Sequence, residues 1–114
     1  YSVLGNGFMQ NLTTTAAQFE RRVKAVLRHC DVETLTISEK DNISRFKTAL
    51  HEAKLDIRDY EYAESRDEQL KWAKIGRHNL AVVNTLMLRL DTVFGAADVA
   101  EFGATIDQLQ TGLE

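Results

Sequence analysis

The side chains in this sequence best suited to chemistry are three histidines and one cysteine. A carboxylate-bridged metal site in a helical bundle needs Glu-x-x-His pairs that face the core. No glutamate stands three residues before His29, His51 or His78, and none of these histidines falls in an apolar helical stripe. The sequence also lacks a His-Glu-x-x-His motif and a glycine-rich phosphate loop. We therefore expect neither a bound metal nor a cofactor.

The single cysteine, Cys30, lies in the apolar stripe of a predicted helix. Reactive cysteines are partly exposed beside a positive group, so we expect Cys30 to be an inert, buried thiol. One cysteine cannot form an internal disulfide, and the fold therefore does not depend on an oxidising compartment. This favours a cytoplasmic location.

Arg45 and His51 are separated by five residues on one predicted helix. This spacing resembles the Arg-x(4–6)-His element of HEPN-type helical ribonucleases, which are small bundles and usually dimeric. The resemblance covers seven residues and implies a ribonuclease, or a toxin–antitoxin component, in which Arg45 and His51 are catalytic. A polar residue typically follows the arginine in that family, whereas Phe46 follows it here. We keep this function as the alternative to a non-enzymatic one.

Length, composition and charge exclude several classes of protein. The 114 residues allow one domain. Proline is absent and glycine numbers only six, which argues against a loop-rich β-sandwich or barrel and favours long helices. The net charge of −3 lacks the basic surplus with which nucleic-acid binders neutralise phosphates, so we expect no nucleic-acid partner. No apolar run reaches the roughly 18 residues that span a bilayer, so we expect no membrane partner.

Apolar residues recur with helical spacing in four segments, which predict helices over residues 12–31, 39–63, 66–94 and 98–113. Because the connections are short, sequential helices should be antiparallel neighbours. We predict an all-α fold, an antiparallel four-helix up-down-up-down bundle with the third helix longest and central. A three-helix bundle whose fourth segment docks on another chain is the alternative. Residues 9–114 would form this single domain, and residues 1–8 would be a leader or an upstream fragment.

Capping residues mark the predicted helix boundaries. Ser65, with a glutamate three residues later, predicts the start of the third helix. Ser38 is a suitable cap for the second helix, and Thr15 or Asn11 for the first. We expect Gly95 to end the third helix in a left-handed conformation.

Two small or polar residues interrupt the apolar stripe of the third predicted helix. Gly76 could let a neighbouring helix approach closely because it has no side chain. We predict that Asn79 is buried and hydrogen-bonded, and that it specifies the register of the helices.

A second apolar line lies outside the predicted core stripes of the second and third helices. Its members are Leu55, Tyr62, Leu70, Ala81 and Leu88. A monomeric bundle needs one apolar stripe per helix, so another chain should cover this line. We therefore predict a homodimer held by these residues. The function that follows is non-enzymatic and acts through protein–protein interaction, with the chain itself and an unidentified protein as partners.

Overall fold

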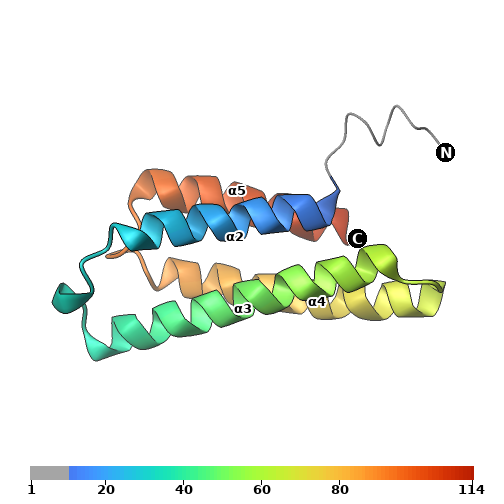
Figure 1. Cartoon of the computed structure of the whole chain (residues 1–114), viewed down its shortest axis with the longest axis horizontal. Helices are drawn as coiled ribbons and strands as arrows, with labels where there is room; N and C mark the ends of the chain where they lie inside the picture. Colours follow the sequence, from blue (N-terminus) through green and yellow to red (C-terminus); the bar gives the residue numbers. More distant parts are fainter. Residues whose placement is uncertain (1–10) are drawn as a thin grey trace.

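A computed structural model describes residues 11–114 and shows an all-helical chain (Figure 1). Four α-helices and one short 3₁₀ helix are present, and this part of the chain contains no strand. The expectation about residues 1–8 lies outside the described residues. The elements are α2 (Leu12–Arg28), η1 (Val32–Thr34), α3 (Ile37–Tyr62), α4 (Arg66–Leu88) and α5 (Ala96–Gly112).

The four helices form two pairs, with α2 beside α5 and α3 beside α4 (Figure 1). Helix α3 also packs on α2, and α4 also packs on α5, so each helix has two main neighbours. The α3–α4 contact is the most extensive of the four, and the α2–α5 contact is the smallest. Helix α5 buries Phe102, Ile106 and Leu109, so this segment packs within its own chain rather than requiring another chain.

The third predicted helix is shorter than expected. Helix α4 has 23 residues and ends at Leu88, whereas the prediction extended to residue 94 and made this helix the longest. The longest helix is α3, with 26 residues. Residues after Leu88 form hydrogen-bonded turns, in which the amide of Phe94 donates to the carbonyl of Leu90 at 2.8 Å. The expected left-handed stop is wrong too, because Gly95 has a φ of −69° and caps the start of α5.

Side-chain caps explain where the first three helices begin. Ser65 caps α4 as predicted, since its hydroxyl accepts the amide three residues later at 3.1 Å. Asn11, one of two predicted candidates, caps α2. Helix α3 begins two residues earlier than predicted, because Thr36 rather than Ser38 forms a capping box with Glu39.

A chain of four aromatic rings runs through the core. Phe46 of α3 lies 5.5 Å from Phe94, measured between ring centroids. Phe94 lies 5.3 Å from Phe102 of α5 in an edge-to-face contact, and Phe102 lies 5.6 Å from Phe19 of α2. All four rings are buried. They therefore connect α2, α3, α5 and the α4–α5 turn into one core.

Candidate functional site

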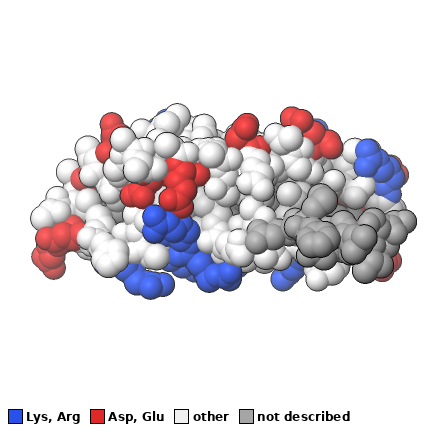
Figure 2. All heavy atoms as spheres, turned by 90° about the horizontal axis from the view of Figure 1, so that it is seen from above, with Lys and Arg blue, Asp and Glu red and all other residues white. Residues whose placement is uncertain are grey.

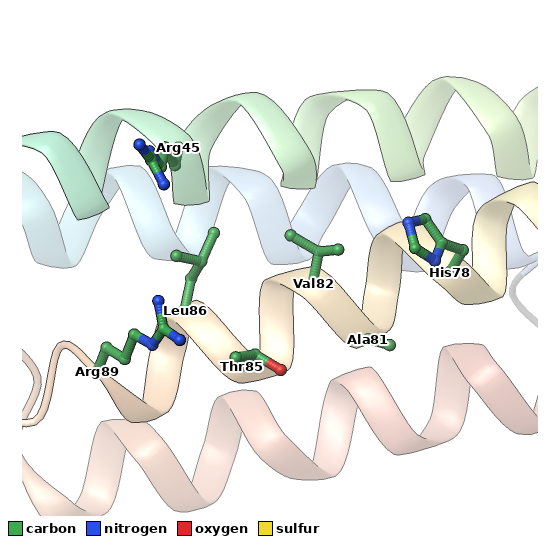
Figure 3. A pocket seen from close by; sticks show the side chains of 7 residues that line it. All are labelled: Arg45, His78, Ala81, Val82, Thr85, Leu86 and Arg89. Atoms are coloured by element: carbon green, nitrogen blue, oxygen red, sulfur yellow. The ribbon is translucent and has the colours of Figure 1, made fainter.

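A groove of about 450 Å³ lies between α3 and α4. Helix α3 contributes one lining residue, and α4 with its C-cap contributes the other six (Figure 3). The floor of the groove is apolar and is formed by Val82 and Leu86. Leu86 is buried and Val82 is half-buried, so the floor of the groove belongs to the core surface. The lining residues are Arg45, His78, Ala81, Val82, Thr85, Leu86 and Arg89.

Arginine side chains stand at one end of this groove and a histidine at the other. Arg45 and Arg89 lie at one end and His78 at the other (Figure 3). The Nε atom of Arg45 is 3.0 Å from a carboxylate oxygen of Asp41, its neighbour one turn away. Arg89 and His78 make no side-chain hydrogen bond or ion pair within residues 11–114. The groove therefore has an apolar floor and two arginines at one end.

The five residues of the predicted interface lie on α3 and α4 but do not share one groove. Tyr62, Leu70 and Leu88 are 77%, 51% and 59% exposed, whereas Leu55 is half-buried. Ala81 is exposed and lines the α3–α4 groove. Tyr62 instead lines a hollow together with residues from the start of α2. The exposed apolar surface is therefore spread over two sides of the α3–α4 pair.

The structure does not bring Arg45 and His51 together within one chain. Arg45 lines the groove beside α4. His51 points to α2, where its Nδ1 lies 3.1 Å from a carboxylate oxygen of Glu20. The two residues predicted by the ribonuclease resemblance therefore lie on different sides of α3.

Glu20 is a buried carboxylate between α2 and α3, with 7% of its surface exposed. The Nζ of Lys54 donates to it at 2.7 Å, and His51 contacts its other oxygen. Burial alone would raise the pKa of Glu20, but the hydrogen bonds from Lys54 and His51, with the charges of Lys54 and Lys24, outweigh it and lower the pKa. The sequence analysis missed this cluster. The one signal for it was the position of Glu20 four residues after Ala16, at the edge of the apolar stripe.

Asp56 of α3 is the second buried acidic residue, with 8% of its surface exposed. The side-chain amide of Asn79 donates to it at 2.6 Å, so the predicted hydrogen bond of Asn79 is present, although Asn79 is half-buried rather than buried. A Cβ added to Gly76 would lie 3.5 Å from the Cβ of Asp56 and 3.1 Å from the Cδ1 of Leu113. The distance to Asp56 is an ordinary contact, whereas that to Leu113 is tight, so Gly76 permits the close approach of Leu113 at the end of α5.

Burial raises the pKa of Asp56, and the charges of Glu52 and Asp59 raise it further, against the lowering effect of the Asn79 hydrogen bond. A raised pKa means that folding favours the protonated form, so the ionised form weakens the fold at pH 7. Asp56→Asn keeps an acceptor for Asn79 and removes the charge. We expect it to raise the free energy of unfolding at pH 7 by no more than about 1 kcal/mol, since water still reaches part of the carboxylate.

Urea unfolding of both proteins across the pH range tests this expectation. The higher free energy of unfolding of Asp56→Asn relative to the wild type should be present at pH 7. This difference should fade as the pH falls through the folded pKa of Asp56 towards its ordinary value of 3.8. Asp67→Asn, at an exposed position on α4, is the control and should show no such trend. A destabilised Asp56→Asn protein at pH 7 would contradict the assignment.

The expectation that Cys30 is buried is wrong. Cys30 is half-buried rather than buried, because α2 ends at Arg28 and leaves Cys30 in the following turn. Within the part of the chain that the structure describes, no three His, Cys, Asp or Glu side chains gather as a metal site. No helix among those residues is long and apolar enough to cross a bilayer.

No family model matches the chain, and comparisons with the curated proteins and with the solved structures find no match.

Proposed function

We propose that this protein is a non-enzymatic, antiparallel up-down-up-down four-helix bundle that self-associates and acts by binding another protein. The surfaces involved are the α3–α4 groove and the exposed side chains of Tyr62, Leu70 and Leu88. A cytoplasmic location is part of the proposal and rests on the lone Cys30, which needs no oxidising compartment.

The observation that carries this proposal is the apolar surface that α3 and α4 leave uncovered. Tyr62, Leu70 and Leu88 are each more than half exposed, and the α3–α4 groove adds a separate surface with an apolar floor. Single exposed leucines are common in monomers, but several large exposed apolar residues on one helix pair, together with an apolar groove, favour an interaction site. Burying apolar surface contributes about 25 cal/mol of favourable free energy per Å², so a complex with a protein on this face would be stabilised.

Two-fold symmetry offers a simple arrangement for self-association. Leu70 and Leu88 are 18 residues apart, which is five helical turns, so they lie on one side of α4 with Ala81 between them. A two-fold axis near Ala81 would place the Leu70 end of one helix against the Leu88 end of the other. One self-complementary surface then satisfies both chains.

The test is Leu70→Glu/Leu88→Glu, measured by light scattering at tens of micromolar. We expect the wild type to have twice the monomer mass of 12.9 kDa, and the double variant to be a folded monomer. Each buried apolar side chain is worth roughly 1.5–3 kcal/mol, so the dissociation constant should rise by more than about 100-fold. Circular dichroism should show unchanged helicity, because both positions are exposed.

Val32→Glu/Ile37→Glu is the matched control. These two residues are 57% and 86% exposed and lie outside α4, so the same change in charge should leave the dimer intact. A monomeric wild type, or a control that dissociates as readily as the α4 variant, would contradict self-association through α4.

The ribonuclease alternative is not favoured by any contact within one chain, since Arg45 and His51 lie on different sides of α3. It would need these residues to meet across two chains.

A further inference from the structure

The chain is acidic overall, but its charges are unevenly distributed. Figure 2 shows basic side chains gathered near the middle of one long edge of the molecule. Three basic side chains meet between α2 and α3: Lys24 and Arg28, one turn apart on α2, and Lys47 on α3. Together with Leu27 they line a hollow of about 280 Å³, and no carboxylate lines it.

These cations are poorly neutralised by the protein itself. Arg28 and Lys47 have no ion-pair partner within residues 11–114. The Nζ of Lys24 is 4.0 Å from Glu20, a carboxylate that Lys54 already holds at 2.7 Å. Like charges one turn apart on a helix repel each other, so the hollow retains a positive potential that an anion would relieve.

Some arginines of the fold are ion-paired and others are not. Arg22 of α2 lies 3.0 Å from Glu101 of α5, and Arg45 lies 3.0 Å from Asp41, whereas Arg89 has no such partner within residues 11–114. The hollow brings Lys24, Arg28 and Lys47 around one space that no carboxylate lines.

We infer that this hollow binds a phosphate group. The guanidinium of Arg28 can donate two parallel hydrogen bonds to phosphate oxygens, and the two lysines add charge from the opposite helix and from the adjacent turn. Leu27 gives the hollow an apolar wall for the organic part of a phosphorylated molecule. The ligand class is a compact phosphate, either free or carried by a small molecule.

The neighbouring surface limits the ligand to one phosphate group. An adjoining hollow shares Lys24 and Lys47 but is also lined by the carboxylates of Glu20 and Glu52. A second phosphate placed there would meet negative charge. A nucleic-acid backbone, which presents phosphates in succession, therefore fits this surface less well than a small ligand.

The test is a two-dimensional NMR titration of the ¹⁵N-labelled protein at constant ionic strength, with inorganic phosphate and with glycerol 3-phosphate. Sodium chloride and glycerol are the reference additions. We expect saturable shifts centred on the amides of Lys24, Arg28 and Lys47. Arg28→Gln/Lys47→Gln should weaken binding at least about tenfold, because hydrogen bonds between charged groups are lost.

Lys74→Gln/Arg58→Gln removes the same charge from exposed positions on α4 and α3 and is the matched control. It should bind phosphate as the wild type does. Tighter binding of glycerol 3-phosphate than of phosphate would identify a phosphorylated molecule as the ligand, and equal binding would identify the free ion. Both results support the inference.

Three results would overturn the inference: no saturable shift, equal weakening in the control variant, or a twelve-nucleotide oligonucleotide that binds far more tightly than phosphate. The inference does not depend on self-association. Light scattering of Arg28→Gln/Lys47→Gln should give the wild-type mass, so failure of one proposal is distinguishable from failure of the other.

Discussion

Phe102→Ala is expected to lower the free energy of unfolding by about 3–5 kcal/mol, the usual cost of removing a buried aromatic ring. Phe102 is fully buried, and its ring contacts those of Phe19 and Phe94. Its loss would open a cavity where α2, α5 and the α4–α5 turn meet. Because small domains are stable by only about 5–15 kcal/mol, this single change should remove a large part of the total.

Urea unfolding followed by circular dichroism measures this effect. Phe102→Leu keeps most of the buried volume and should cost clearly less than the alanine variant. Gln108→Ala, at an exposed position of the same helix, should stay within about 0.5 kcal/mol of the wild type. A Phe102→Ala protein as stable as Gln108→Ala would show that the aromatic chain does not hold the fold together.

Glu20→Gln should lower the free energy of unfolding at pH 7 by about 1.5–3 kcal/mol, the range for hydrogen bonds to charged groups. The change leaves the ammonium of Lys54 without a counter-charge in a partly buried position. Because the folded pKa of Glu20 is lowered, its contribution is present above the ordinary pKa of 4.5 and is lost as the pH falls through the folded value. The difference in the free energy of unfolding between wild type and variant should therefore shrink as the pH is lowered below 4.5.

Unfolding of Glu20→Gln and the wild type at pH 7 and at successively lower pH tests this result. Glu33→Gln, an exposed change of the same kind in η1, should have little effect at any of these pH values. A difference for Glu20→Gln that stayed constant into acid would contradict an ionised Glu20 held by Lys54 and His51.

The helix starts could be predicted where the capping signal was local and unique. Ser65 with its glutamate gave the start of α4 correctly. At α3 the prediction named Ser38, whereas the cap is Thr36, whose Glu39 three residues later completes a capping box. The end of α4 was predicted too late because Leu90 and Phe94 continue the apolar spacing. Both residues are buried, but they belong to turns. Their apolar spacing therefore indicated that they are buried, not that they are helical.

The candidate surfaces could be predicted only in part. Helical spacing identified Leu70 and Leu88 as outward-facing, and both are exposed. It could not show the α3–α4 groove, which depends on how two helices are placed. Nor could it show the Glu20 cluster, since Lys54 is 34 residues away in sequence. The phosphate hollow likewise needs Lys47 to lie across from Lys24.

The packing of each helix mainly on its sequence neighbours has a kinetic consequence. The α3–α4 contact, the most extensive in the molecule, joins two helices separated by a turn of three residues, 63–65, so closing it costs little chain entropy. The α2–α5 contact joins the first and last described helices and is the smallest. Chains dominated by such local contacts fold within microseconds to milliseconds. We therefore expect the α3–α4 hairpin to form first, and the docking of α5 on α2 to complete folding.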